Sequence, residues 1–198
     1  MPHIIHLLKD KKLGSIIALQ PTYELKRRNN VHLHICASII SQQLSTKVAD
    51  VIFSRFIKLF NKKNPGPQDI LDVPFEDLRS IGLSNAKANY VRNVCQFFID
   101  NKLTDARLHK MDDNSFIDFL TQIKGIGRWT AEMILMFTLA REDVFAIDDL
   151  GIQQAMTKLY KLDATNKKDM QARMLVIAEK WKPYRTYACR YLWGWKDL

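Results

Sequence analysis

Apolar residues recur every three or four positions through most of the chain. Residues at that spacing share one face of an α-helix, whereas a half-buried strand needs strict alternation of apolar and polar residues. No sustained alternation occurs anywhere in the sequence. The clearest helical series is Leu33, Ala37, Ile40 and Leu44 within residues 31–60. The pattern therefore predicts an all-α protein.

Polar interruptions and capping residues mark where individual helices begin and end. The run Ser-Gln-Gln-Leu-Ser at residues 41–45 predicts two helices that meet at a sharp corner, the second capped by Ser45 or Thr46. Asp112 or Asp113 is expected to cap a helix ending near Leu120. Further helices are expected at residues 4–8 and 16–19, separated at Gly14, and at 68–71, 85–99, 151–160, 167–181 and 184–195, with a polar connection at 101–111.

Residues 119–149 carry the most distinctive local pattern. A short helix is followed by the tight turn Lys124-Gly125-Ile126-Gly127 and by a second helix that begins at Arg128. Two glycines around one apolar residue let the backbone turn sharply and approach something outside the protein. The second helix then presents free N–H groups and the positive end of its dipole. Such an end attracts an anion, and the phosphate of a nucleic-acid backbone is the expected one.

Asp148 and Asp149 end this stretch, just before the helix expected at residues 151–160. Carboxylates are favoured N-caps, and a pair that simply caps a helix is the commoner outcome of such a pattern. If Asp148 is the cap, the carboxylate of Asp149 remains for chemistry. The residues alone leave both alternatives open.

Two further basic residues carry weaker signals. Ile81-Gly82 followed by Lys87 is a fainter version of the glycine turn, and a phosphate contact by Lys87 and a purely structural turn are equally open. For Arg185, an ion pair within the protein is favoured over a phosphate contact.

Composition and charge narrow the class of protein. A chain of 198 residues can form one sizeable core or two lobes, and 47% hydrophobic with 26% charged residues is ordinary for a globular protein. The 30 lysines and arginines exceed the 21 aspartates and glutamates, which gives a formal net charge of +9. An acidic partner is expected, nucleic acid first and an anionic membrane surface second.

The three cysteines, Cys36, Cys95 and Cys189, are too scattered for a disulfide framework or for a zinc or iron–sulfur site. A reducing compartment is expected. The first apolar run is too short for a signal peptide, and no run approaches the roughly 20 residues that span a bilayer. These features favour the cytoplasm, with the protein nucleoid-associated in a bacterium or nuclear in a eukaryote.

Gly125-Ile126-Gly127-Arg128-Trp129-Thr130-Ala131, followed about two dozen residues later by Asp148-Asp149, resembles the hairpin and catalytic loop of the helix-hairpin-helix DNA glycosylases. The closer match is the branch that excises alkylated bases, the 3-methyladenine-DNA glycosylase II type. The family often has proline where this chain has Lys124, which adds a cation beside the expected phosphate. The resemblance runs from about Val31 to the C-terminus.

This resemblance implies a single all-α domain, a two-lobed helical bundle with a helix-hairpin-helix motif and a cleft between the lobes. Lobe 1 is expected mainly over residues 31–110. Lobe 2 is expected over residues 111–198 together with the N-terminal segment 1–30. The family's extra N-terminal β domain is not expected in a chain of this length.

The resemblance also assigns the chemistry. The second aspartate of the pair aligns with the catalytic residue of the family, so Asp149 is the candidate and Asp148 the runner-up. Bifunctional members of the superfamily place a lysine nucleophile where this chain has Trp129, so no lyase activity is expected. Trp129 and Trp193 are implied as walls of the base pocket, although core packing is an equal alternative for Trp193. Met133 stands where the branch often has a third aromatic residue.

The DNA contacts implied by the resemblance fall on two segments. The corner at Gln42, Gln43 and Leu44 is the implied wedge that fills the gap left by an extruded base. The implied backbone contacts are Lys124, Gly125, Gly127, Arg128 and Thr130. In the family the hairpin carbonyls often hold a sodium or potassium ion, and the carbonyls near Thr121, Ile123 and Ile126 are the implied site for one; no cofactor is otherwise expected.

The sequence thus predicts a monomeric, monofunctional DNA glycosylase. Its expected partner is double-stranded DNA containing alkylated purines such as 3-methyladenine and 7-methylguanine. Two alternatives remain. One is a glycosylase for another lesion, namely uracil, hypoxanthine or an oxidised purine, and the other is a non-catalytic helix-hairpin-helix module that binds DNA.

Overall fold

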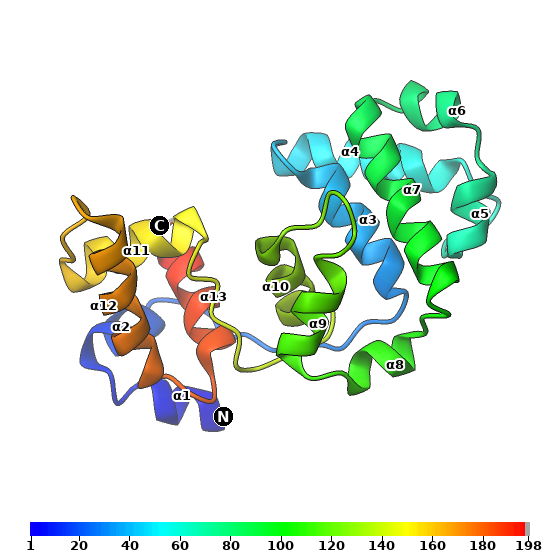
Figure 1. The fold of residues 1–198 in the computed structure, drawn as a ribbon. Helices are drawn as coiled ribbons and strands as arrows, with labels where there is room; N and C mark the ends of the chain where they lie inside the picture. Colours follow the sequence, from blue (N-terminus) through cyan, green and yellow to red (C-terminus); the bar gives the residue numbers. More distant parts are fainter. Residues whose placement is uncertain (197–198) are drawn as a thin grey trace. The chain divides into compact units, whose positions relative to one another are not determined.

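A computed structural model describes residues 1–196, and all of its regular elements are α-helices (Figure 1). The all-α prediction is confirmed. The chain divides into two compact units, named here unit 1, which comprises Met1–Arg27 and the chain from Leu135 onward, and unit 2, which comprises Arg28–Ile134. None of the described helices is both long and apolar enough to cross a membrane.

Unit 2 is built around α7, which packs against α3, α5 and α6. Its core is made of apolar residues on the facing sides of these helices, among them Ile35 and Ile39 of α3 and Val91 and Val94 of α7, all fully buried. The helices of unit 2 are α3 (Val31–Ser41), α4 (Thr46–Lys58), α5 (Pro67–Asp72), α6 (Phe75–Ser80), α7 (Asn85–Asp100), α8 (Asp105–Lys110), α9 (Asp113–Leu120) and the first turns of α10 (Arg128–Phe137).

The division between the units falls at Ile134, not at residue 110 as expected. The reason is that the hairpin formed by α9, its turn and the start of α10 is attached to α7. The ring of Phe119 lies 4.9 Å from that of Phe97, and the side-chain amide of Asn93 donates to the carbonyl of Lys124 at 3.3 Å. The hairpin therefore belongs to unit 2.

The expectation of a polar connection at residues 101–111 is wrong, because α8 forms there. The Thr104 hydroxyl caps it by accepting from the Arg107 N–H at 3.2 Å, and Leu108 is its buried residue. The carboxylate of Asp105 accepts the N–H groups of Asn30 and Val31, at 2.6 and 3.0 Å, and so closes the start of α3. One apolar residue is too weak a periodic signal to predict such a helix.

Unit 1 contains α1 (Pro2–Leu7), α2 (Lys11–Ile17), α11 (Leu150–Tyr160), α12 (Lys167–Glu179) and α13 (Arg185–Lys196). Helix α13 packs against α11 and α2. The predicted break at Gly14 is wrong, because Gly14 is buried inside α2 and the break falls before Asp10, the N-cap of α2.

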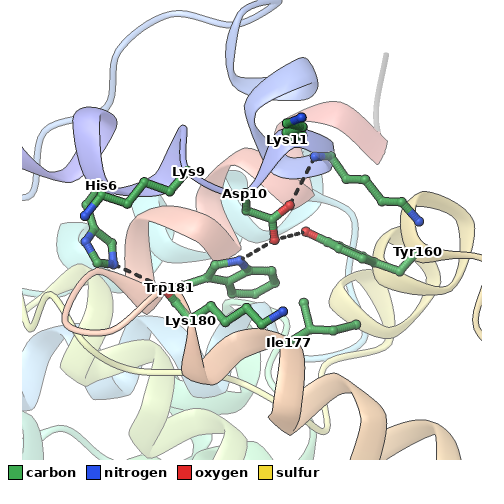
Figure 2. A pocket seen from close by; sticks show the side chains of 9 residues that line it. His6, Lys9, Asp10, Lys11, Tyr160, Ile177, Lys180 and Trp181 are labelled. Carbon is green, nitrogen blue, oxygen red and sulfur yellow. Dashed lines mark hydrogen bonds between the residues drawn. The ribbon is translucent and has the colours of Figure 1, made fainter.

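Asp10 ties this N-terminal corner to the rest of unit 1 (Figure 2). One carboxylate oxygen caps α2 by accepting the N–H groups of Lys12 and Leu13. The other accepts the Tyr160 hydroxyl at 2.7 Å and the indole N–H of Trp181 at 3.1 Å. Burial alone would raise the pKa of Asp10, but these hydrogen bonds outweigh it and lower the pKa below its usual value.

Candidate active site

Asp149, and not Asp148, is the N-cap of α11. Its Oδ1 accepts the Ile152 N–H at 2.9 Å, and its own N–H donates to the Ala146 carbonyl at 3.1 Å. Asp148 is exposed and accepts the side-chain amide of Gln171 on α12 at 2.9 Å. Of the alternatives that the residues alone leave open, the structure shows Asp149 as the cap, and its half-buried carboxylate is held at the helix start.

The indole of Trp193 on α13 reaches the same carboxylate. Its Nε1–H donates to Asp149 Oδ1 at 2.8 Å, and its ring lies against Phe137 with a centroid distance of 5.8 Å. Oδ1 thus accepts two N–H donors from two different helices. Trp193 is half-buried, so it combines packing with a polar contact that fixes the orientation of Asp149.

Gly151, in the first turn of α11, makes this approach possible. A Cβ atom at this position would lie 3.1 Å from Asp149 Oδ1 and 3.1 Å from Trp193 Cδ1. Those distances are shorter than ordinary carbon contacts, so a side chain there would push the indole away from the carboxylate. Sequence reasoning missed Gly151. Its only signal is a glycine placed two residues after the candidate aspartate.

The loop before Asp149 is anchored to the start of α13. The fully buried Thr186 hydroxyl donates to the Arg141 carbonyl at 2.6 Å and accepts the Val144 N–H at 3.0 Å. Arg185 makes a bidentate ion pair with Asp143, with distances of 2.7 Å from Nε and 2.9 Å from Nη2. The preference for a structural ion pair at Arg185 is confirmed, and these contacts fix the path of the loop to Asp149.

The hairpin turn of unit 2 uses its two glycines differently. Gly125 has φ +104°, and a Cβ atom there would overlap the ring of Tyr90 on α7. Gly127 is exposed, and a Cβ atom added to it would meet no neighbouring atom within 4 Å. The fold therefore requires glycine at position 125, whereas nothing within the protein requires it at position 127.

The predicted DNA-contact and base-pocket residues at the start of α10 differ in their exposure to solvent. Arg128 pairs with Glu132 at 2.9 Å, and the two side chains are 60% and 3% exposed. Thr130 is only 3% exposed, which removes its side chain from the surface expected to contact DNA. Trp129 is 41% exposed and Met133 is half-buried. Unit 2 thus carries Trp129 and Met133, and unit 1 carries Asp149 and Trp193.

The carbonyls proposed for an alkali ion lie at the end of α9 and in the turn. The Ile123 carbonyl accepts the Ile126 N–H at 3.0 Å and keeps a second lone pair for an ion. The Thr121 hydroxyl donates backwards to the Ile117 carbonyl at 2.9 Å. A carbonyl-bound ion stays a prediction. Within residues 1–196, no three His, Cys, Asp or Glu side chains are placed to hold a metal ion.

The predicted wedge forms a turn at Ser41–Leu44, named here the wedge turn. Gln42 leaves α3 with φ −51° and ψ 131°, and Gln43 has φ +60°, in the left-handed region. Gln43 and Leu44 are exposed, Leu44 at 36%. The Lys87 ammonium donates to the carbonyls of Ile40 and Gln42, so the structural alternative for Lys87 has direct support.

Unit 1 also contains a cavity. It has a volume of about 510 Å³ and sits at the corner between α1 and α2, beside Asp10 (Figure 2). Its lining includes His6, Tyr160, Trp181 and several lysines. It shares no residue with the candidate site, so cavity size alone does not locate the chemistry.

Comparison with known proteins finds one family model and several close relatives. Residues 36–182 match the model described as HhH-GPD superfamily base excision DNA repair protein. The chain is 37% identical over 196 residues to DNA-3-methyladenine glycosylase 1 of Schizosaccharomyces pombe, covering 96% of this chain and 84% of the relative.

Two solved structures have nearly the same fold. One is a crystal structure of DNA-3-methyladenine glycosidase from Bacillus halodurans, with a TM-score of 0.84 and 33% identity, covering 98% of this chain and 88% of that one. The other is 3-methyladenine DNA glycosylase of S. pombe in complex with abasic DNA. It has a TM-score of 0.83 and 33% identity, and the match covers 100% of this chain and 98% of that one.

Proposed function

The chain belongs to the HhH-GPD superfamily of base excision DNA repair proteins, and on that premise we propose that it is a monofunctional DNA glycosylase for alkylated purines. Its substrates are proposed to be 3-methyladenine and 7-methylguanine in double-stranded DNA. Relatives named as 3-methyladenine glycosylases cover nearly the whole chain, and one of them has been solved with abasic DNA, the product of base removal.

The observation that carries the proposed mechanism is the fixed carboxylate of Asp149. Cleavage of an N-glycosidic bond builds positive charge on the sugar, as in glycoside hydrolysis. A carboxylate held beside the anomeric carbon stabilises that charge or orients the attacking water. The helix cap and the Trp193 indole both fix Asp149 Oδ1, so the group needs little reorganisation during the reaction.

One carboxylate suffices when the base is already a good leaving group. An N-alkylated purine carries formal positive charge, so it leaves readily and stacks well against aromatic rings. The exposed ring of Trp129 and the ring of Trp193 are the proposed stacking surfaces. No lysine stands at position 129, so no Schiff base is expected there and the strand is left uncut.

DNA binding is proposed to use the hairpin and the wedge turn. The N–H groups at the start of α10, with Lys124 exposed beside them, suit a backbone phosphate. The target base must leave the duplex before Asp149 can act on its sugar, and the wedge turn would fill the gap. Because its proposed substrate is DNA, the protein is expected to act in the compartment that holds the DNA of the cell.

A panel of duplex oligonucleotides tests this function. Each carries one 7-methylguanine, 3-methyladenine, hypoxanthine, uracil or 8-oxoguanine, and strand cleavage is scored with and without alkali. We expect cleavage only for the methylated purines and only after alkali, because abasic sites accumulate intact. If the protein bound the DNA but released no base, it would be a non-catalytic DNA-binding module. Cleavage without alkali would contradict the monofunctional assignment.

A further inference from the structure

Lys87, at the start of α7, contacts the end of α3. Its Nζ donates to the carbonyl of Ile40 at 2.9 Å and to that of Gln42 at 2.6 Å. The two helices pack side by side (Figure 1). The last carbonyls of a helix lack partners within the helix and carry the negative end of its dipole. The ammonium therefore caps α3 from a different helix.

The wedge turn that follows contains one backbone hydrogen bond of its own and one strained residue. Its backbone hydrogen bond from Leu44 N–H to the Ser41 carbonyl is 3.1 Å long. Gln43 adopts φ +60°, a conformation that costs a non-glycine residue free energy. Such a conformation persists when its surroundings hold it. The Gln42 carbonyl, adjacent to the strained residue, is the atom that Lys87 holds most closely.

The surroundings of Lys87 fit a positional role. The side chain is half-buried beside a cavity of about 230 Å³ lined by the wedge turn and by residues 82–84. Burial lowers the pKa of Lys87 below its usual value. Among the described residues, no carboxylate lies within ion-pair distance of its ammonium. The positive charge of the ammonium is therefore stabilised by carbonyl dipoles, and two of its three N–H groups donate to these carbonyls.

We propose that Lys87 is a positioning residue for base extrusion, which holds the wedge turn in the conformation that enters the DNA duplex. This inference rests on the proposed glycosylase function. Lys87 itself touches neither the sugar nor the base. Its contribution is needed when a stacked base must leave a paired duplex and is not needed when the base is already unpaired.

The test compares Lys87→Met with the wild type on two substrates. One is a fully paired duplex containing 7-methylguanine, and the other is the same strand without its complement. We expect the single-turnover excision rate of Lys87→Met to fall by about tenfold to a hundredfold on the duplex, since small misplacements of positioning groups have effects of that size. On the single strand the rate should match the wild type. Lys87→Arg, which can donate to both carbonyls, should restore the duplex rate.

A matched control removes a different charge from the same unit. Lys110 is exposed at the end of α8, and Lys110→Met should leave both rates unchanged. Equal losses on duplex and single strand would overturn the proposal, because they would indicate a general effect on the fold or on phosphate binding. Unchanged duplex excision by Lys87→Met would also overturn it. Should that variant fail to fold, Lys87→Gln keeps an uncharged amide that can still donate and should show a smaller loss, still confined to the duplex.

A fluorescence measurement decides the proposal independently of base release. A 2-aminopurine placed next to the lesion brightens when the stack is opened, whether or not the lesion is then excised. We expect the wild type to raise this signal and Lys87→Met to lose the rise at saturating protein. If the wild type released no base, the proposed function would fail, while this signal would still test Lys87. An equal rise in both proteins would contradict its role.

Discussion

The carboxylate of Asp149 accepts two hydrogen bonds through the same oxygen. Its Oδ1 caps α11 and also accepts the indole N–H of Trp193. Asparagine is as good an N-cap as aspartate. A change from carboxylate to amide therefore keeps the cap and removes the charge. The structural and chemical roles of this residue can be separated by substitution, which is not true of a residue buried in the core.

The bond from Trp193 gives the first prediction. Trp193→Phe keeps an aromatic ring beside Phe137 and removes the donor to Asp149. A hydrogen bond to a charged group contributes about 1.5–3 kcal/mol, so the single-turnover excision rate should fall by roughly tenfold to a hundredfold. Duplex affinity should change much less.

The matched control for that variant is Gln171→Ala, which removes the corresponding donor to Asp148. Its excision rate should equal that of the wild type, because the carboxylate proposed to act is that of Asp149. A loss as large as that of Trp193→Phe would show that Asp148 shares the chemistry.

At this scale the sequence can name residues but not their contacts. Asp149 and Trp193 are identified through the resemblance, yet the bond between them joins positions 44 residues apart and depends on the space left by Gly151. The sequence does not decide which of the two aspartates caps the helix, because both are equally good caps by type. The turn from Ala146 to Asp149 decides between them, and its geometry is not encoded in residue type.

In the hairpin, the two glycines of the turn differ in whether the fold itself requires glycine at their positions. Gly125 needs a positive φ and a close approach of Tyr90, and both needs arise inside the protein. A Cβ atom at Gly127 would meet no neighbouring atom, so the absence of a side chain there is significant only for a molecule that binds from outside.

This difference gives the second prediction, measured by chemical unfolding and by duplex affinity. Gly125→Ala should lower the free energy of unfolding by about 2–5 kcal/mol, from overpacking together with backbone strain. Gly127→Ala should lower it by less than about 1 kcal/mol, because the added methyl group meets no neighbouring atom. Duplex affinity of Gly127→Ala should nevertheless fall, because the added methyl group obstructs the phosphate. Equal stability losses would refute this assignment of the two glycines.

The corner between α1 and α2 gives the third prediction. The pKa of Asp10 is lowered in the folded protein relative to about 3.9 in an unfolded chain. Its hydrogen bonds therefore stabilise the fold above that value and lose their effect as the pH falls through the lower, folded pKa. Asp10→Asn should melt at a lower temperature than the wild type at pH 7, and the gap should narrow towards pH 3.

Asp118→Asn is the control for Asp10, because Asp118 is an exposed carboxylate on α9. Its melting temperature should follow that of the wild type across the same pH range. A gap between Asp10→Asn and the wild type that stayed constant with pH would show that packing, not the charge of Asp10, holds this corner.

Helices with a long apolar stripe are predictable from the sequence, and a short helix such as α5 can be too, but α8 is not. The corner between α3 and α4 and the start of α12 at Lys167 lie at their predicted places. Helix α8 escapes prediction because Leu108 is its one buried residue. The break near α1 is expected at Gly14 because glycine usually interrupts a helix, whereas here Gly14 packs against Leu8 inside unit 1.

For the whole molecule, the formal net charge of +9 makes DNA affinity depend on salt. Each neutralised phosphate contributes about 0.9 to the slope of log affinity against log salt. Lys124→Ala should reduce that slope by about 1 and weaken binding to undamaged and damaged duplex alike. Lys110→Ala should leave the slope unchanged. If the salt dependence of DNA affinity had the same slope for Lys124→Ala as for the wild type, Lys124 would not contact a phosphate in the complex.

The fold class is predictable from the apolar pattern of the whole chain and the family from residues 119–149, but the division of the chain is not predictable. The hairpin is expected to belong with the C-terminal part. Instead it belongs to unit 2, through contacts of Phe119 with Phe97 and of Gly125 with Tyr90. These are long-range contacts between side chains on α7 and residues of the hairpin, and no local pattern encodes them.

The central claim is that the Asp149 carboxylate performs the excision, and Asp149→Asn tests it most directly. The measurement is single-turnover release of 7-methylguanine from duplex DNA, alongside duplex affinity and melting temperature. We predict that release falls by at least about a thousandfold, as for loss of a central catalytic group, while affinity and melting temperature stay close to those of the wild type. Release at the wild-type rate from a folded, DNA-binding Asp149→Asn protein would contradict the claim.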